Sequence, residues 1–544
     1  MQQRKSVLRC CVALLLTHLC EPLDTRQLHE WRLPHTYVQT AGCVPSDRIS
    51  AFFEYPQFRM RQPRPEKGWD AWDTMWLCNM LGRSVEASGV DFERMATGQT
   101  VNTFPGVYAE TNNKINFCRH VHKAFPLTQG KDFHMPCFVL PEDSSLLRAN
   151  LREGKGFLER RWVTKPEAGS GGKGLQLFSS AQILQILEQA QRTSGRVYVQ
   201  EYLHKTLLLE YATEQLPETG VSTVPLVKVK FDFRVYFTIT SLQPLRVWVH
   251  RYGFSRLSTK EFSLVGEHAR DLQRHVANVD FQKKQKNYRA PRSSKDDCSG
   301  ATRSLDCVIK DIANQTGKSA TDVWFSICDV LGKTGLTVQQ ALKQPTSCTG
   351  CYQFWGADLV FDSKGNPFML EINSSPAIDQ EYLIMMGTGL VSIYPELWKL
   401  KGVDPLTDRI QCNLTTLAKY IDPHKTHRNG LLRRWLLMDV EPSHTDTVVI
   451  SDMLSEMRNR GGFDLGWPTR TAVISRLDNE RVVGACNASG VSPTLQNNGE
   501  SRLEQKDGSH LLSWYDASLY EIFFLLTEHP NKNILQTNCR PVSQ

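Results

Sequence analysis

Two kinds of hydrophobic pattern alternate along the middle of the chain. Apolar residues at every second position, or in short β-branched runs, predict a series of strands. These strands are expected at 162–165, 175–178, 196–203, 227–240, 245–250, 354–362 and 367–372. Residues 181–191 instead repeat apolar side chains at helical spacing, and residues 363–366 (SKGN) predict a turn between the last two strands. This mixture predicts an α/β fold of the mixed α+β kind.

The flanking regions are patterned differently. Between residues 30 and 140, aromatic-rich patches such as 68–81 have helical character and are separated by turns. Residues 281–297 are polar and basic, which predicts a mobile loop. Residues 481–509 are polar and rich in Gly, Asn and Ser, as is typical of a linker, and an apolar, helix-like segment follows at 511–526.

The N-terminus carries a short basic segment before an apolar run. Arg4, Lys5 and Arg9 precede residues 10–20 (CCVALLLTHLC), the order found in a signal peptide or a weak signal anchor. A membrane-spanning helix needs about 20 residues, and this run is shorter. The alternative is a buried first helix, so the pattern alone leaves both interpretations open.

Composition narrows the class of protein. The chain has 544 residues, a formal net charge of +7 and 40% apolar residues, typical of a folded chain with several domains. No composition or period of a collagen, coiled coil or disulfide scaffold is present, and the mild basicity fits acidic partners without requiring nucleic acid. The 15 scattered cysteines favour cytosolic thiols over a disulfide framework. The isolated pair Cys348 and Cys351 is weak support for zinc.

Residues 367–375 (PFMLEINSS) have the sharpest chemical pattern. In a strand, successive side chains point to opposite faces. One face is then expected to carry Phe368, Leu370 and Ile372, and the other Met369, Glu371 and Asn373.

Carboxylate and carboxamide oxygens on one face are ligands that suit Mg²⁺. An antiparallel partner strand could bring Asp358 beside Glu371. Acids buried in a strand-rich region are costly unless they are paired or bound to metal. The alternative for each of them is a salt-bridged acid or an acid at the rim of the sheet.

Residues 230–234 (KFDFR) place three charges on one strand face. Lys230, Asp232 and Arg234 alternate with Phe231 and Phe233, which are expected to face the core. Lysine and arginine together could hold phosphate and a carboxylate, and arginine can do so with two hydrogen bonds. A solvated sheet face is the alternative.

A glycine cluster follows the strand at 162–165. Residues 169–174 (GSGGKG) could bring backbone N–H groups close to phosphates. The string matches the dinucleotide-binding pattern formally, but a strand follows where that fold needs a helix, and the P-loop pattern fails at Gly174. We therefore predict a hairpin that closes over a nucleotide, with a simple glycine turn as the alternative. The strand end at 200–203 (QEYL) could offer backbone groups to an adenine edge.

Eight segments in this order resemble the tubulin–tyrosine ligase-like family of the ATP-grasp superfamily, and most resemble its tubulin polyglutamylases. The segments are VNTFPG (101–106), FVLPED (138–143), WVTKPEAGSGGKG (162–174), QEYL (200–203), KFDFR (230–234), GFSR (253–256), HVANVDFQKKQKNY (275–288) and WGADLVFDSKGNPFMLEINSSP (355–376). The match extends from about residue 101 to residue 397.

The resemblance implies an ATP-grasp fold and a division of the chain into parts. These are a leader at 1–25, an N-terminal α/β domain at 30–145, a central ATP-grasp domain at 146–225, a C-terminal ATP-grasp domain with the metal site at 226–405, and an extension at 406–544.

The resemblance also implies roles for individual residues. The magnesium ligands are expected to be Asp358, Glu371 and Asn373. Catalytic residues are expected to be Arg234, Arg256 and Glu371, with Arg256 on the incoming amino acid. The ATP site is expected to include Lys165, Lys173, Gly174, Gln200, Glu201, Tyr202, Leu203, Lys230, Asp232 and Asn278.

The implied activity is an ATP-dependent carboxylate–amine ligase that adds glutamate to glutamate side chains of tubulin tails through an acylphosphate. ATP and Mg²⁺ are the expected cofactors, and microtubules and a free amino acid the expected partners, without nucleic acid. The basic residues of 281–297 and 419–434 could steer an acidic tail, or be ordinary surface. The cytoplasm, the cytoskeleton or a cilium is the expected location, with a membrane tether through the leader as a further option.

Two departures from the family pattern bear on this expectation. The usual His-Leu-Thr-Asn is His275-Val276-Ala277-Asn278 here, and no lysine occurs between Asn373 and Lys399, where glutamate-adding members often have one. Glycine or tyrosine as the added amino acid therefore stays as an alternative. An inactive microtubule-binding scaffold is a further alternative, against which the intact Asp358, Glu371 and Asn373 argue.

Overall fold

The computed structural model describes the middle of the chain almost continuously and the two ends in pieces. The described residues are 37–39, 72–77, 91–96, 99–153, 157, 159–166, 174–192, 195–212, 225–290, 298–345, 348–376, 410–412, 414, 421, 426, 443–461, 463–469, 472–473, 477, 514–527 and 539–541.

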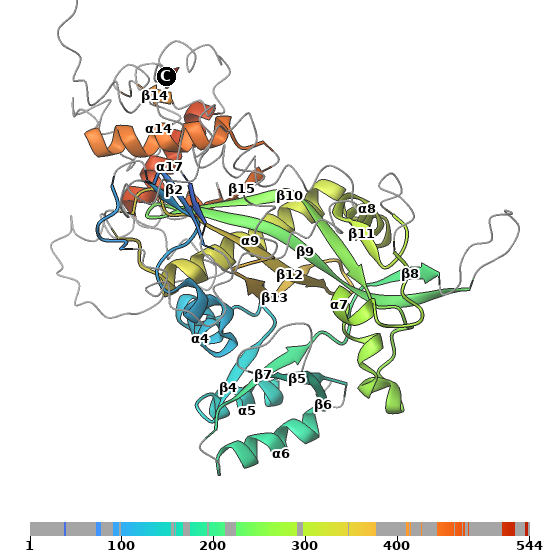
Figure 1. Ribbon diagram of the computed structural model, residues 1–544. Coiled ribbons are helices and arrows are strands. Elements are labelled where there is room, and N and C mark those ends of the chain that lie inside the picture. Colours follow the sequence, from blue (N-terminus) through green and yellow to red (C-terminus); the bar gives the residue numbers. More distant parts are fainter. Residues whose placement is uncertain are drawn as a thin grey trace, which may run out of the picture.

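A four-stranded antiparallel sheet forms one end of the molecule, with two helices on one face (Figure 1). Its strand order is β4-β7-β5-β6. The elements are β4 (Cys137–Leu140), α5 (Ser144–Glu153), β5 (Arg161–Lys165), β6 (Gln176–Ser179), α6 (Ser180–Ala190) and β7 (Val197–Tyr202). Trp162, Ile183 and Leu187 are fully buried between sheet and helices. Ser179 starts α6 because its side chain accepts from the backbone N–H of Gln182, whose side chain accepts in return.

A seven-stranded sheet forms the centre of the molecule. Its main order is β11-β10-β9-β12-β13, and β8 and β15 add to β9 and β10. The strands are β8 (Leu208–Ala212), β9 (Leu226–Leu242), β10 (Leu245–Leu257), β11 (Thr302–Ser304), β12 (Gln353–Phe361), β13 (Pro367–Asn373) and β15 (Phe463–Trp467). The long pair β9 and β10 extends beyond its partners and carries much of the functional site.

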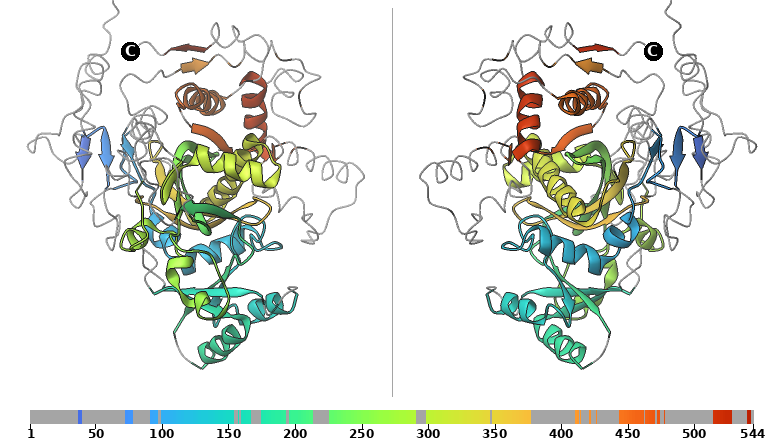
Figure 2. Two further views of the ribbon diagram at one scale, coloured as in Figure 1. Left: turned by 90° about the vertical axis from the view of Figure 1, so that its right-hand side faces the viewer. Right: turned by 90° about the vertical axis from the view of Figure 1, so that its left-hand side faces the viewer.

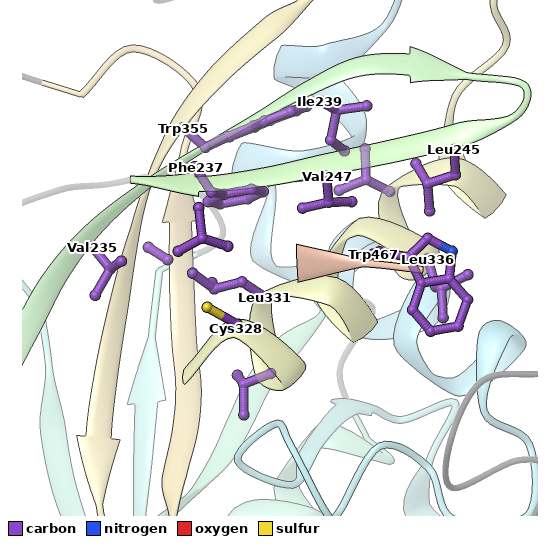
Figure 3. Close-up of a cluster of buried hydrophobic side chains, with 14 of the residues drawn as sticks. Val235, Phe237, Ile239, Leu245, Val247, Cys328, Leu331, Leu336, Trp355 and Trp467 are labelled. Atoms are coloured by element: carbon purple, nitrogen blue, oxygen red, sulfur yellow. The ribbon is translucent and has the colours of Figure 1, made fainter. Parts of the chain in front are cut away.

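The helix α9 (Ala320–Ala341) covers one face of this sheet (Figure 3). Its Leu331 and Leu336 lie toward the strand residues Phe237 and Val247, all of them fully buried. Gly335 permits this close approach, because a Cβ there would lie 2.4 Å from Val247. Fully burying one large aliphatic or aromatic side chain contributes roughly 1.5–3 kcal/mol, so this layer is a main source of stability.

The remaining elements surround the two sheets. They are β1 (Tyr37–Gln39), β2 (Thr74–Trp76), β3 (Thr100–Val101), η3 (Tyr108–Asn112), α4 (Lys114–Ala124), η4 (Gly266–Arg270), η5 (Leu272–Arg274), α7 (Val279–Gln282), α8 (Leu305–Thr316), β14 (Ile410–Cys412), α14 (His444–Arg458), α17 (Trp514–Thr527) and β16 (Cys539–Pro541). Figure 2 shows α14 and α17 at the end of the molecule opposite the four-stranded sheet.

A buried carboxylate fastens α14 to the central sheet. Glu456 accepts hydrogen bonds from Arg246 Nε at 2.9 Å and Nη2 at 3.0 Å, from Trp248 Nε1 at 2.9 Å and from Thr240 Oγ1 at 2.9 Å. All four groups are buried, so the acid is fully paired where an unpaired charge would be costly.

The predicted strands and the helix at 181–191 are confirmed, as is the helix-like segment near the C-terminus, and the antiparallel α/β arrangement is consistent with an ATP-grasp fold. The helical interpretation of 68–81 is wrong at Thr74–Trp76, which form a short buried strand. The predicted loop at 281–297 begins inside α7, and its last seven residues, 291–297, lie outside the described residues. The leader at 1–25, the linker at 481–509 and nearly all of 419–434 also lie outside them.

Neither sheet coincides with one of the expected domains. The four-stranded sheet takes β4 from before residue 146, and the seven-stranded sheet takes β8 from before residue 226. Chain order and sheet membership therefore differ at both borders, while the domain division itself stays a prediction.

The expectation of free thiols is wrong for several cysteines. The structure joins Cys118 to Cys137, Cys298 to Cys307 and Cys348 to Cys351 as disulfides. Cys348 and Cys351, the pair suggested as a zinc site, are therefore joined to each other by a disulfide bond. Among the helices in the described ranges, none is both long enough and apolar enough to cross a membrane.

Candidate active site

A pocket lies between the two sheets, and most of the residues predicted from the sequence line it. These are Lys165, Gln200, Glu201, Tyr202, Leu203, Lys230, Asp232, Arg256, Asn278, Asp358 and Glu371. Gly174, Arg234 and Asn373 do not line it, and Lys173 lies outside the described residues. Residues that are far apart in sequence therefore meet in one cavity.

The predicted alternation along β9 is confirmed. Phe231 and Phe233 are fully buried in the core, so Lys230, Asp232 and Arg234 point to the other face. Strand register then sets the neighbours of these charged residues.

Four of these charged groups form an arginine–aspartate ladder across β9, β10 and β12: Asp232, Arg234, Arg256 and Asp358. Arg256 lies opposite Asp232, and Arg234 lies opposite Asp358. Arg256 Nε donates to Asp232 Oδ1 at 2.5 Å, and its Nη2 lies 2.9 Å from Asp358 Oδ2. Arg234 Nε and Nη2 donate to the two oxygens of Asp358 at 2.6 and 3.3 Å. All of these guanidinium and carboxylate groups are mostly or fully buried, yet each has a partner of opposite charge.

The ladder sets the charge state of its acids. Burial alone would raise the pKa of Asp358, but the guanidiniums of Arg234 and Arg256 outweigh it and hold the pKa at about 2. Asp232 has one arginine and also faces Asp358, so burial raises its pKa above the ordinary value. The ladder is thus a compensated group in which Asp358 stays ionised.

Glycine at position 356 makes room for this arrangement. An added Cβ would lie 2.8 Å from Cδ of Arg234 and 2.9 Å from Cβ of Pro376. A larger residue would push the guanidinium away from Asp358, so a glycine at this position of β12 suits the ladder.

A second group, the lysine cluster, consists of Lys114, Lys165 and Lys230. Lys165 Nζ donates to Gln200 Oε1 at 3.0 Å. Lys114 Nζ and Lys165 Nζ lie 3.7 and 3.9 Å from the same oxygen of Glu371. Burial lowers the pKa of Lys165, although Glu371 partly restores it.

Lys230 lies over an aromatic ring. Its Nζ is 3.9 Å from the ring centroid of Tyr202, a distance that permits a cation–π interaction. Burial lowers the pKa of Lys230 to about 7, despite the nearby Asp232. The lysine is therefore less readily charged than a solvent-exposed lysine, and a bound anion would favour its charged form.

The Tyr202 hydroxyl is held by a histidine of fixed tautomer. His275 Nε2 lies 2.9 Å from the backbone oxygen of His268, which can only accept, so Nε2 carries the proton. Nδ1 then accepts from the Tyr202 hydroxyl at 3.1 Å. Burial lowers the pKa of His275 to about 4, so the ring is neutral at pH 7.

The strand end at 200–203 lines the pocket, but the carboxylate of its Glu201 is not available to a ligand. Glu201 pairs with Arg160 through bonds of 2.8 and 2.7 Å, so its carboxylate is occupied. Asn278 also has a structural task, because its side chain caps α7 by accepting from the backbone N–H of Phe281. What these residues can present to a ligand is mainly strand-end backbone, the Tyr202 ring and the Asn278 amide.

The predicted pairing of Asp358 with Glu371 is confirmed, but the predicted alternation along β13 is wrong. The two acids are direct cross-strand neighbours. A bulge lies just before Glu371 on β13, where Leu370 is the extra residue. Met369 is therefore fully buried, while Leu370 and Glu371 both line the pocket. A bulge inserts one residue and reverses the facing of the residues beyond it.

The donor set is chemically suited to a hard cation. Asp358, Glu371 and Asn373 offer carboxylate and carboxamide oxygens on two paired strands, with Asp358 directly opposite Glu371. Asp358 is already paired with two arginines, whereas the side chain of Glu371 keeps 32% of its surface exposed. Glu371 is therefore the acid of this set that is more open to a ligand.

The two strands that flank the glycine segment form the predicted hairpin. β5 and β6 pair antiparallel, with Thr164 opposite Gln176, so 166–175 connect two strands of a hairpin. Gly174 ends this connection with φ of +72°, which a residue with a side chain rarely adopts.

Two polar residues of the pocket were not predicted as site residues. Lys114 is the first residue of α4, which begins there because Asn113 accepts from two backbone N–H groups. His275 was noted only as part of a motif. The position of Lys114 depends on the packing of α4 against the distant helix α9 and against β4, and no local pattern in the sequence marks it.

A comparison with known protein families decides the relationship. The model of the tubulin-tyrosine ligase family matches residues 92–390, more than half of the chain. The chain belongs to this family. All described pocket residues fall inside the matched range.

Characterised relatives are similar over the same part. The tubulin polyglutamylase ttll-11 of Caenorhabditis elegans is 25% identical over 320 residues, which are 56% of this chain and 42% of the relative. A probable beta-tubulin polyglutamylase of Tetrahymena thermophila is 26% identical over 299 residues, 53% of this chain and 23% of that protein. The tubulin monoglutamylase TTLL4 of Mus musculus is 26% identical over 320 residues, 57% and 23% of the two chains. The similarity thus spans less than half of each relative.

Proposed function

We propose that this protein is an ATP-dependent ligase that joins glutamate to glutamate side chains in the acidic tails of tubulin. The observation that carries the proposal is the lysine cluster around Glu371, directly beside the ladder and within the family-matched region. In the proposed reaction, an acceptor carboxylate attacks the γ-phosphate of ATP, giving an acylphosphate and ADP. The amine of the incoming amino acid then displaces phosphate and forms the amide.

The lysine cluster is suited to the phosphates. Phosphoryl transfer depends mostly on positioning and on neutralising charge. Lys165, fixed by Gln200, and Lys230, fixed over Tyr202, would present preorganised positive charge in a water-poor site. Burial lowers the pKa of both lysines, and a bound anion would favour their charged forms.

Asp358 and Glu371, which line the pocket, would hold magnesium, with Asn373 on the same strand as Glu371 as a further ligand just outside the lining. The charge of the magnesium would add to that of the lysines on the phosphates. Arg234 keeps Asp358 ionised and oriented without lining the pocket, so we assign it a positioning role. Arg256 does line the pocket and is fixed by Asp232, so its remaining donors suit the α-carboxylate of the amino acid.

Glutamate is favoured over glycine and tyrosine because the similar proteins named above are tubulin glutamylases. The intact, mutually paired acids argue against an inactive scaffold, because charged groups kept buried at this cost suit a working site. A location in the cytoplasm and on the cytoskeleton follows from the proposed substrates.

Parallel labelling tests this function. The full chain is incubated with ATP, magnesium, microtubules and isotope-labelled glutamate, glycine or tyrosine, and the tubulin is analysed by mass spectrometry. The proposal expects glutamate in the tails and no glutamate in matched tubulin whose tails were removed by limited proteolysis. Incorporation of glycine or tyrosine instead would overturn the amino acid, and microtubule binding without any incorporation would support a scaffold.

A further inference from the structure

Two cysteines and one histidine meet where α4 packs against β4. Cys118 and His122 are four residues apart on α4, and Cys137 is the first residue of β4. Side chains at this spacing lie on one face of a helix. The two sulfur atoms and one imidazole nitrogen all lie within 4.8 Å of one another. In the described part of the chain, no other group of three His, Cys, Asp or Glu residues has this spacing.

The imidazole of His122 faces a different group with each nitrogen. Nε2 lies 3.9 Å from Sγ of Cys118, and Nδ1 lies 4.0 Å from Oδ2 of Asp143. The Asp143 carboxylate is fixed, since the same oxygen accepts a 2.7 Å hydrogen bond from the backbone N–H of Val139. Metal-binding histidines typically present one nitrogen to the metal and the other to a carboxylate or a carbonyl.

We propose that Cys118, His122 and Cys137 form a zinc site when the two cysteines are reduced. Thiolates and a neutral imidazole are preferred ligands of Zn²⁺, and three protein ligands leave the fourth position to water. In the structure the two cysteines are joined as a disulfide, so the oxidised form and the zinc form exclude each other.

The conversion between the two forms is balanced. A dithiol reductant transfers two electrons and two protons to the Cys118–Cys137 disulfide and becomes a disulfide itself. Zinc then displaces the two thiol protons and forms two bonds to sulfur and one to Nε2 of His122. Because cytosolic thiol pools keep cysteines reduced, the zinc form is expected where tubulin resides. Only this choice of compartment rests on the proposed function.

The site lies on the helix that carries a pocket lysine. α4 begins at Lys114, whose Nζ is 3.7 Å from Glu371, and continues to Cys118 and His122. A bond from α4 to β4, whether through zinc or through sulfur, therefore fixes the helix that holds Lys114 at the pocket. The reduced, zinc-free chain lacks this link.

Zinc binding by matched variants tests the proposal. The full chain is reduced with a water-soluble phosphine, stripped of metal and titrated with Zn²⁺; Co²⁺ is used in parallel for its thiolate charge-transfer absorption. His122→Ala removes a ligand. His120→Ala is the matched control, because His120 is on the same helix but its Nε2 lies 2.6 Å from Glu110. Asp143→Asn removes only the carboxylate charge behind the histidine.

The reduced wild type and His120→Ala are expected to bind one more equivalent of zinc than the oxidised chain. His122→Ala should lose that equivalent, and Asp143→Asn should weaken it about 10–100-fold. Equal binding by His122→Ala and wild type, or by oxidised and reduced chains, would overturn the site. If His122→Ala does not fold by circular dichroism, unchanged affinity in Asp143→Asn would overturn it. Failure of glutamate incorporation would leave the zinc result untouched.

Discussion

The arginine–aspartate ladder and the lysine cluster lie side by side at one pocket but differ in how their buried charges are compensated. In the ladder, two arginines and two aspartates pair with each other. In the cluster, Lys114 and Lys165 share the single carboxylate of Glu371, and Lys230 lies over an aromatic ring. The charges of the ladder balance one another, whereas the cluster has more positive than negative charge and suits an anion.

Both groups contribute residues to the proposed site, but this difference predicts that changes in the two groups cost different amounts of stability. Breaking a compensated buried pair leaves an isolated charge and is strongly destabilising. Removing a cation that burial already disfavours should cost little stability, and its effect should appear when an anion binds. Each prediction below changes one member of one group.

The largest effect is expected for Asp358→Asn. The change keeps the size of the side chain but leaves Arg234 and Arg256 with one acid between them, so the free energy of unfolding should fall by about 3–5 kcal/mol. Denaturant unfolding measures this loss. Glu456→Gln is the matched control, because it breaks a buried arginine pair far from the pocket. It should destabilise the fold without changing nucleotide affinity, and a loss below about 1 kcal/mol in Asp358→Asn would contradict the compensated ladder.

Lys165→Met should show the opposite pattern. Loss of one charge-assisted contact of about 1.5–3 kcal/mol should weaken binding of an ATP analogue roughly 10–100-fold. The unfolding midpoint should stay the same or rise, because a desolvated cation has been removed. Calorimetric titration and thermal unfolding provide the two readouts. A destabilised variant with normal affinity would show that Lys165 stabilises the fold and does not contribute to nucleotide binding.

The pH dependence of nucleotide binding should reveal Lys230. Its pKa is about 7 in the folded chain and near 10.5 in the unfolded chain, so the unfolded state binds the extra proton between these values. This residue therefore makes stability rise with pH from about 7 upward. An anion favours the charged form, so affinity for an ATP analogue should fall above pH 7 by at most about tenfold per pH unit. Lys230→Met should flatten this profile, and an unchanged profile would contradict the assignment.

Tyr202→Phe should have the smallest effect. It removes one hydrogen bond to His275 but keeps the ring beneath Lys230, so stability should fall by about 0.5–1.5 kcal/mol. Tyr202→Leu, which also removes the ring, should weaken nucleotide binding more than the phenylalanine variant does. Equal affinities in the two variants would exclude a role for the cation–π contact.

The sequence predicts those parts of the site that depend on local alternation. Period two along β9 placed Lys230, Asp232 and Arg234 on one face, and a short turn placed Asp358 opposite Glu371. The bulge before Glu371 could not be predicted, because it depends on the register in which β12 and β13 pair rather than on residue type.

Long-range register is also absent from the sequence pattern. Arg234 and Asp358 are 124 residues apart, and their contact depends on how β9 and β12 align. The same holds for Lys114, which reaches the pocket only because α4 packs against distant elements. The residue types of these contacts can be predicted, but which acid meets which base cannot.

The most direct test compares glutamate incorporation by the wild type and by Glu371→Gln. Both proteins are supplied with ATP, magnesium, labelled glutamate and microtubules, and the tails are analysed by mass spectrometry, with Glu456→Gln as the folding control. The account predicts incorporation by the wild type and by folded Glu456→Gln, and about a 100-fold loss or more in Glu371→Gln, because the variant loses the charge that would hold magnesium and orient Lys114 and Lys165. Unaltered incorporation by folded Glu371→Gln would contradict the assignment of this pocket as the active site.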